Sequence, residues 1–155
     1  SSQSPISINR HKGQRSQKFP NFLKLKIPTG GDILHGMLEN DGYSFRVQII
    51  GGTTDVKLTD GPLKGKTYSL RQFHFHFPCT EEITASEHSI EGQKYTAEAH
   101  FIFFNDKYSS FEAAENQPDG LVVLALLINI GDDCVFKGIC QLKNITDNII
   151  EARIN

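Results

Sequence analysis

The chain has 155 residues, which is long enough for one domain with a substantial core and too short for two full domains. Its 16 basic and 18 acidic residues give a net charge of -2, which argues against a nucleic-acid partner and favours a small or neutral one. The longest apolar run, Leu121 to Ile128, is far shorter than the roughly 20 residues of a membrane span, so no span is expected in this segment.

Period-two alternation of apolar residues predicts most of the secondary structure. After an extended lead-in over residues 1–20, the sequence predicts strands over 23–27, 43–49, 68–77, 94–104 and 121–130. The last of these is apolar apart from Asn129 and is long enough for a central strand covered on both faces. Helical spacing appears only over 109–115 and 133–150. The predicted fold class is therefore mainly β with minor helices.

The cysteines, one sequence triplet and the chain ends bear on the cellular context. Cys79, Cys134 and Cys140 form an odd set without a CxxC pair, so we expect buried thiols and neither a disulfide framework nor a structural zinc site. The glycosylation acceptor triplet at 144–146 slightly favours an extracellular or secreted location. Because the chain opens on Ser and closes on polar residues 151–155, we expect a single domain over 1–155 that is incomplete at both ends.

Three histidines lie on two of the predicted strands. Along residues 72–77, alternation places Gln72, His74 and His76 on one face and three phenylalanines on the other. The same rule places Glu98, His100 and Ile102 on one face of the next strand. If these strands pair with those faces aligned, the three imidazoles converge.

Three neutral imidazoles with one open position form the ligand set of a catalytic zinc ion. A metal-bound imidazole usually donates its second N–H group to an oriented acceptor, and Gln72 and Glu98 each lie two residues before a histidine. A single histidine on an apolar strand is more often a hydrogen-bonded core residue, which is how we interpret His11 and His35. The third histidine on a second strand favours a zinc site.

These residues belong to a longer series of motifs. In chain order the series comprises Gln3-Ser4-Pro5-Ile6, residues 40–45, Gly61-Pro62-Leu63, residues 68–76, Ser86-Glu87-His88, residues 95–100, residues 105–108 and residues 117–121. With this series the chain resembles the α-class carbonic anhydrases nearly from end to end. The resemblance implies a twisted mixed or antiparallel central sheet, here in truncated form, and reversible hydration of carbon dioxide by hydroxide on a zinc ion.

The resemblance also implies roles for individual residues. His74, His76 and His100 match the zinc ligands, Gln72 and Glu98 match the residues that orient two of them, and His88 matches a structural neighbour. Glu87 matches a buried carboxylate that supports a gatekeeper threonine, which would lie beyond Asn155. Ile102 and Val123 match apolar walls of the substrate pocket. Carbon dioxide and bicarbonate would be the ligands, and sulfonamide-type compounds the expected inhibitors.

The chain departs from the family pattern near the cavity. Tyr43 stands where fast family members carry a proton-shuttle histidine, and a phenol with an ordinary pKa of about 10 relays protons poorly at neutral pH. Slow, buffer-dependent turnover is the expectation. Arg46 replaces a smaller polar residue. Two alternatives remain open: a non-catalytic binding or matrix module that keeps the fold, and a structural zinc site without turnover.

Overall fold

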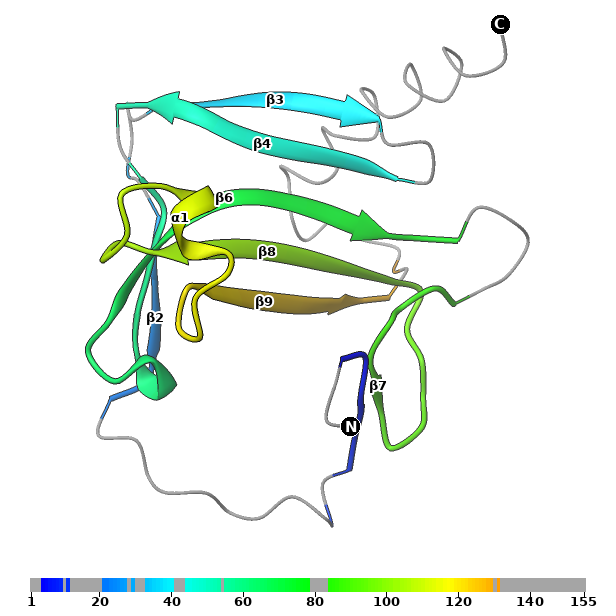
Figure 1. Ribbon diagram of the computed structural model, residues 1–155. Helices are drawn as coiled ribbons and strands as arrows, with labels where there is room; N and C mark the ends of the chain where they lie inside the picture. The colour runs from blue at the N-terminus through cyan, green and yellow to red at the C-terminus, as the bar shows by residue number, and fades with distance from the viewer. Residues whose placement is uncertain are drawn as a thin grey trace, which may run out of the picture.

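The computed structural model describes residues 4–9, 11, 21–27, 29, 33–40, 44–53, 55–78, 84–129 and 131. Seven strands form one antiparallel sheet (Figure 1). They are β2 (Leu23–Lys26), β3 (Leu34–Asn40), β4 (Phe45–Gly52), β5 (Lys57–Asp60), β6 (Thr67–His76), β8 (Ala97–Asn105) and β9 (Leu121–Ile128). Two short strands, β1 (Ser7–Ile8) and β7 (Ser89–Ile90), form a separate parallel pair. The predicted mainly β fold is confirmed.

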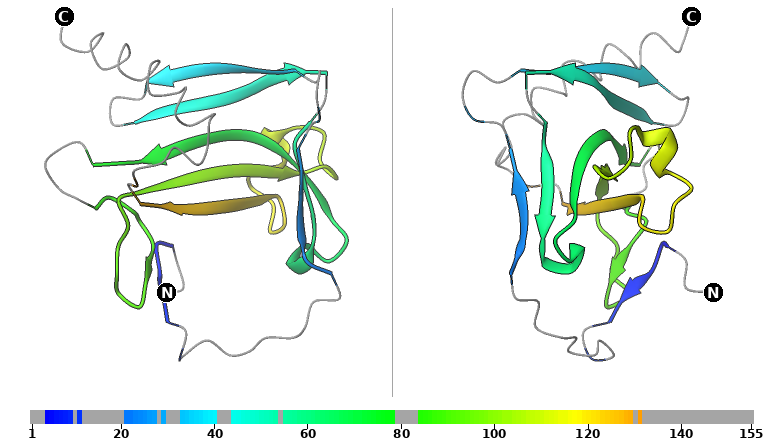
Figure 2. Two further views of the ribbon diagram at one scale, coloured as in Figure 1. Left: turned by 180° about the vertical axis from the view of Figure 1, so that it is seen from behind. Right: turned by 60° about the vertical axis from the view of Figure 1, so that its left-hand side comes forward.

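Strand β6 organises the sheet because it pairs with two strands along one edge. Its first half pairs with β5 and its second half with β4, while β8 pairs along the other edge over nearly its full length. The register with β8 shifts between Leu70 and Gln72, which marks a β-bulge at Arg71. Strands β2 and β5, which lie beside the first half of β6, turn away from the plane of the other strands (Figures 1 and 2).

One face of the sheet carries the hydrophobic core. Phe103, Leu58 and Tyr68 are buried together at the β5 end. At the other end, Phe45, Phe75 and Ala99 form a second buried cluster against which further phenylalanines pack. The rings of Phe45 and Phe75 lie 5.1 Å apart, centroid to centroid. This phenylalanine layer covers the sheet face opposite the histidines, as strand alternation predicts.

Two strands that the sequence did not predict complete the sheet. β3 contains Gly36 and lacks clean alternation, and β5 has only 4 residues, so neither carries a strong local signal. Both are held by pairing with a neighbour, β3 with β4 and β5 with β6. Strand formation here comes from tertiary pairing, which outweighs local propensity.

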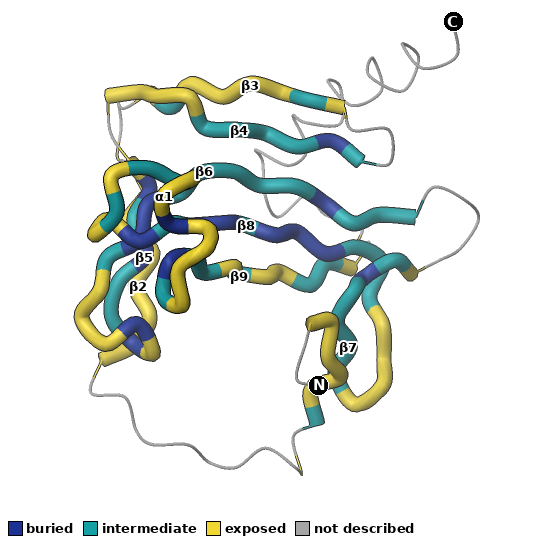
Figure 3. The backbone as a smooth tube through the Cα atoms, in the orientation of Figure 1, coloured by how far each residue is buried: buried dark blue, intermediate teal, exposed yellow. Residues whose placement is uncertain are grey.

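The expectation that the apolar run near residue 121 forms a strand covered on both faces is wrong for the described part of the chain. There β9 pairs only with β8 and is an edge strand, and its residue Val123 is 53% exposed. Figure 3 shows this contrast between β9, which is of intermediate burial or exposed, and the largely buried β8. A continuous apolar run signals β-structure without revealing how much of it is covered.

The predicted helix near residue 109 is observed as a single turn, α1 (Phe111–Ala114). The Ser110 side chain caps it by accepting a hydrogen bond from the backbone N–H group of Ala113. A 3-10 turn, η1 (Gly61–Leu63), connects β5 to β6. No helix in the described ranges is long and apolar enough to cross a membrane.

Several sequence predictions fall outside the described residues. They concern the helix over 133–150, the three cysteines, the glycosylation triplet at 144–146 and Tyr43.

Candidate metal centre

The pairing of β6 with β8 brings the three predicted histidines to one face of the sheet. His74 lies directly opposite His100 in the antiparallel register, and His76 lies opposite Glu98. Directly opposed residues in such a pair have Cβ atoms about 4.5–5.5 Å apart and share a face. The alignment of faces on which the sequence argument depended is therefore present.

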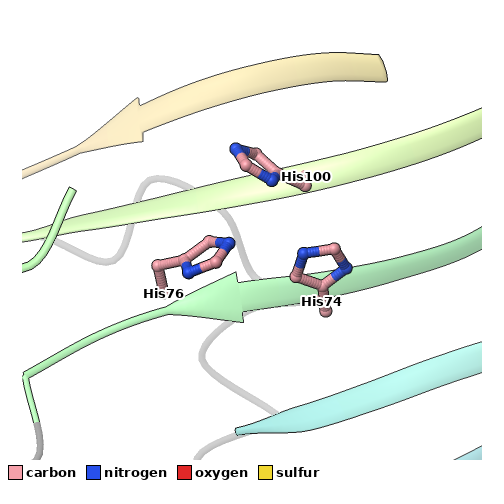
Figure 4. A group of neighbouring side chains, drawn as sticks. All are labelled: His74, His76 and His100. Carbon is pink, nitrogen blue, oxygen red and sulfur yellow. The ribbon is translucent and has the colours of Figure 1, made fainter. Parts of the chain in front are cut away.

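The three imidazole rings surround one small volume (Figure 4). Ring centroids lie 5.1 Å apart for His74 and His76, 5.2 Å for His74 and His100, and 4.7 Å for His76 and His100. One nitrogen from each ring can be chosen so that all three lie within 4.8 Å of one another. Ligand atoms about 2.0–2.1 Å from a shared zinc ion lie within such a separation.

One nitrogen of this cluster has no hydrogen-bond partner among the described residues. Among the described residues, Nε2 of His76 is the buried side-chain nitrogen or oxygen atom that lacks a hydrogen bond. Leaving a buried polar atom unpaired costs about 1–3 kcal/mol, so native structures rarely contain one without a reason. A metal ion bound by all three rings would satisfy this nitrogen, and the residues present therefore fit such an ion.

Glu98 fixes the orientation of His100 from the same face of β8, two residues away. Its carboxylate is fully buried, and Oε1 lies 2.7 Å from Nε2 of His100 and 2.5 Å from Nδ1 of His88. The backbone N–H group of His88 also donates to Oε2 over 2.8 Å. With Nε2 engaged by Glu98, Nδ1 of His100 is the nitrogen that remains for a ligand role.

Opposing effects set the ionisation of Glu98 and of His74. Burial raises the pKa of Glu98, but the His88 backbone N–H group and the His100 and His88 side chains outweigh it and hold the pKa at about 2. Burial lowers the pKa of His74, and the neighbouring His100 and His76 lower it further. The shifts favour a charged carboxylate at Glu98 and a neutral imidazole at His74, and the neutral ring is the form in which histidine binds metals.

The other residues singled out by the sequence lie around the cluster. Oε2 of Glu87 is 3.7 Å from Nε2 of His76 and 4.0 Å from Nε2 of His100. Its side chain is 39% exposed, whereas the resemblance implied a buried carboxylate. Glu87 sits in the loop before β7. Gln72 lies near His74 on β6, but within the described residues no hydrogen bond joins these two side chains.

The histidine face also forms a cavity of about 360 Å³. Gln72, His74 and His76 line it together with Ser44 and Arg46 of the neighbouring strand region. Ile102 and Val123 lie opposite each other on β8 and β9, two residues along the sheet from His100 and on its face. Ile102 is buried at 7% exposure, while Val123 is open to solvent.

Sequence analysis missed one residue near this cavity, Glu39 on β3. It lies opposite Arg46, and its carboxylate binds both Arg46 and Gln48. Because β3 carries no clean strand pattern, only the observed pairing of β3 with β4 reveals this contact.

Comparison with known proteins points to one family. A model of the family described as "Eukaryotic-type carbonic anhydrase" matches residues 1–154. Carbonic anhydrase 6 of Canis lupus familiaris is 36% identical over 133 residues, which is 84% of this chain and 39% of the dog protein. The chain thus spans well under half the length of this relative.

Proposed function

The chain belongs to the eukaryotic-type carbonic anhydrase family, and from this premise we propose that it binds one zinc ion and hydrates carbon dioxide reversibly. One observation carries the proposal: three imidazoles from two paired strands enclose a single point, and among the described residues one of their nitrogens is buried without a hydrogen-bond partner. Such a donor set suits a catalytic zinc ion with one open coordination position.

His74, His76 and His100 would hold the ion. When bound, zinc supplies Lewis-acid chemistry that lowers the pKa of water to about 7 and so provides hydroxide at neutral pH. Glu98 keeps His100 in one tautomer and one orientation by accepting its Nε2–H group. The phenylalanine layer beneath the strands restricts their movement, so the three rings need little rearrangement to act together.

The remaining residues would serve the substrate and the proton. Ile102 and Val123 offer apolar surface to carbon dioxide, which is neutral and poorly hydrated. Glu87 stands at the rim of the cluster, where it would support a gatekeeper hydroxyl group. Proton transfer out of the site would depend on Tyr43, whose phenol is poorly matched to neutral pH, so turnover is slow and rises with added buffer.

Stopped-flow measurement of carbon dioxide hydration by the zinc-loaded chain tests this proposal. We expect turnover that imidazole buffer stimulates and an aromatic sulfonamide abolishes. His100→Ala should eliminate turnover and His74→Ala should prevent stoichiometric zinc binding, because each removes one of three ligands. His35→Ala, on the exposed part of β3, is the matched control and should behave as the parent.

Two outcomes would contradict the proposal in different ways. Full zinc occupancy without turnover would favour the competing hypotheses of a structural zinc site or a non-catalytic binding module. A His74→Ala protein that retains one equivalent of zinc would contradict the ligand set itself.

A further inference from the structure

Arg46 lies beside the histidine cluster, and the proposed reaction gives it no role. It stands opposite His74 in the pairing of β4 with β6, and it lines the same cavity. One row across the sheet runs through Glu39, Arg46, His74, His100 and Ala125. The row therefore places Arg46 on the strand next to the one that carries His74. Figure 1 shows these two strands, β4 and β6, side by side in the sheet.

Glu39 holds this guanidinium by one edge. Nε and Nη2 of Arg46 donate to Oε2 of Glu39 over 3.1 and 3.0 Å. Gln48 donates to both carboxylate oxygens over 3.1 and 3.0 Å, which fixes Glu39 in turn. The arginine is thereby oriented before any ligand arrives, which lowers the entropic cost of binding one.

The other edge of the guanidinium is open. An arginine side chain has five N–H donors, and Glu39 uses one on Nε and one on Nη2. Within the described part of the chain, Nη1 donates to no group, and the side chain is 37% exposed. Nη1 and the second N–H group of Nη2 form the fork that binds planar oxyanions through two parallel hydrogen bonds.

We propose that the open edge of Arg46 forms a subsite for a planar oxyanion at the border of the histidine cavity, with bicarbonate as its natural ligand. The choice of bicarbonate rests on the proposed function, of which it is the product. The subsite itself requires only Arg46, the Glu39 carboxylate that orients it, and the cavity. Glu39 compensates part of the positive charge, so binding is weak and reversible, which suits a position that a product occupies while leaving.

Titration of the zinc-free chain, followed by NMR, tests the subsite without using activity. Bicarbonate, formate and chloride are added at constant ionic strength, and shifts of the Arg46 side-chain Nε–H signal and of the β4 and β6 backbone amides are measured. Bicarbonate and formate, which are planar, should bind in the same place, and chloride should bind more weakly. Arg46→Gln should weaken bicarbonate binding by about tenfold, the usual effect of losing one charge-assisted contact.

Two further variants test whether bicarbonate binding needs the two parallel N–H donors of Arg46 or only a positive charge. Arg46→Lys keeps the charge and loses the fork, so its affinity for bicarbonate should lie between those of the parent and Arg46→Gln. Arg71→Gln removes the same charge from the same sheet, but Arg71 donates to the backbone oxygen of Ile49 and does not line the cavity. Its affinity should equal that of the parent.

The proposal is overturned if Arg46→Gln binds bicarbonate as the parent does, or if Arg71→Gln weakens binding equally. The proposal also fails if Arg46→Lys binds bicarbonate with the parental affinity, or if chloride binds as tightly as formate. Either result would show that the anion is attracted by positive charge alone and not held by two parallel hydrogen bonds. The subsite and the proposed reaction are tested independently. Absence of turnover in the zinc-loaded chain would contradict the reaction without changing the result of the NMR titration, and a chain that turns over carbon dioxide could still lack the subsite.

Discussion

Glu98 is a carboxylate without exposed surface that accepts hydrogen bonds from two histidine rings and one backbone N–H group. Such a residue acts on a metal through the ligand that it orients. Glu98→Gln preserves the shape of the side chain but replaces one acceptor oxygen with a donor group. We expect zinc affinity to fall about 10- to 100-fold, the usual effect of losing an orienting partner, as measured by competition with a chromophoric chelator.

The exposed carboxylate of Glu115 provides the matched control, and Glu115→Gln should bind zinc as the parent does. A second measurement uses the pKa of Glu98, about 2 against an ordinary 4.5. Because the folded state lowers this pKa, the carboxylate stabilises the fold above about pH 4.5, and this contribution is lost as the pH falls through 2. The unfolding free energy of Glu98→Gln should therefore vary less over this range. Unchanged zinc affinity together with an unchanged pH profile would contradict the role of Glu98.

At the scale of single elements, the turn that joins α1 to β9 depends on a close backbone contact. A Cβ atom at Gly120 would lie 1.7 Å from the backbone oxygen of Ala114. The same glycine accepts a hydrogen bond from the backbone N–H group of Asn105 at the end of β8. Gly120→Ala must displace one of these segments, so we expect a loss of about 1–3 kcal/mol in unfolding free energy, measured by urea denaturation.

Gly131→Ala is the control for this substitution, because a Cβ atom there meets no atom of the described residues within 4 Å. It should leave the unfolding free energy within about 0.5 kcal/mol of the parent value. Equal stability of the two variants would mean that the turn adapts freely.

Local sequence patterns predicted the elements that carry the histidines and could not predict their neighbours. The alternation of histidine and phenylalanine over residues 72–77 gives both the strand and its two faces, because each side chain on a strand follows period two. β3 is different: its Gly36 and mixed polarity leave no pattern, so the contact of Glu39 with Arg46 could not be foreseen. The bulge at Arg71 depends on the register with β8, which no local pattern encodes.

At the scale of the whole molecule, the candidate ligands come from two strands that also organise the sheet. β6 contributes His74 and His76, and β8 contributes His100. A zinc ion bound by all three would link these strands and would bind the folded chain alone. We therefore expect zinc to raise the thermal midpoint of unfolding, with a stabilisation of about 2.7 kcal/mol when free zinc is 100 times its dissociation constant.

Thermal unfolding followed by circular dichroism, with added zinc or with EDTA, measures this effect. His100→Ala should show no zinc-dependent shift, and His35→Ala should show the parental shift. A parent chain that binds one equivalent of zinc without any change in its midpoint would mean that the unfolded chain binds zinc equally well, so the site would not depend on the pairing of these two strands.

The bulge in β6 has a consequence for which insertions and deletions this chain tolerates. Before Arg71 the even-numbered residues, Tyr68 and Leu70, face the core, whereas after it the odd-numbered Phe73 and Phe75 do so. The extra residue thus inverts the parity of the strand. Without Arg71, the histidines of β6 would face the hydrophobic core and the phenylalanines would face the cavity side, although the sequence after residue 71 would be unchanged. Deletion of Arg71 would therefore move all the β6 ligands off the cavity face, whereas a substitution of one histidine removes only one ligand.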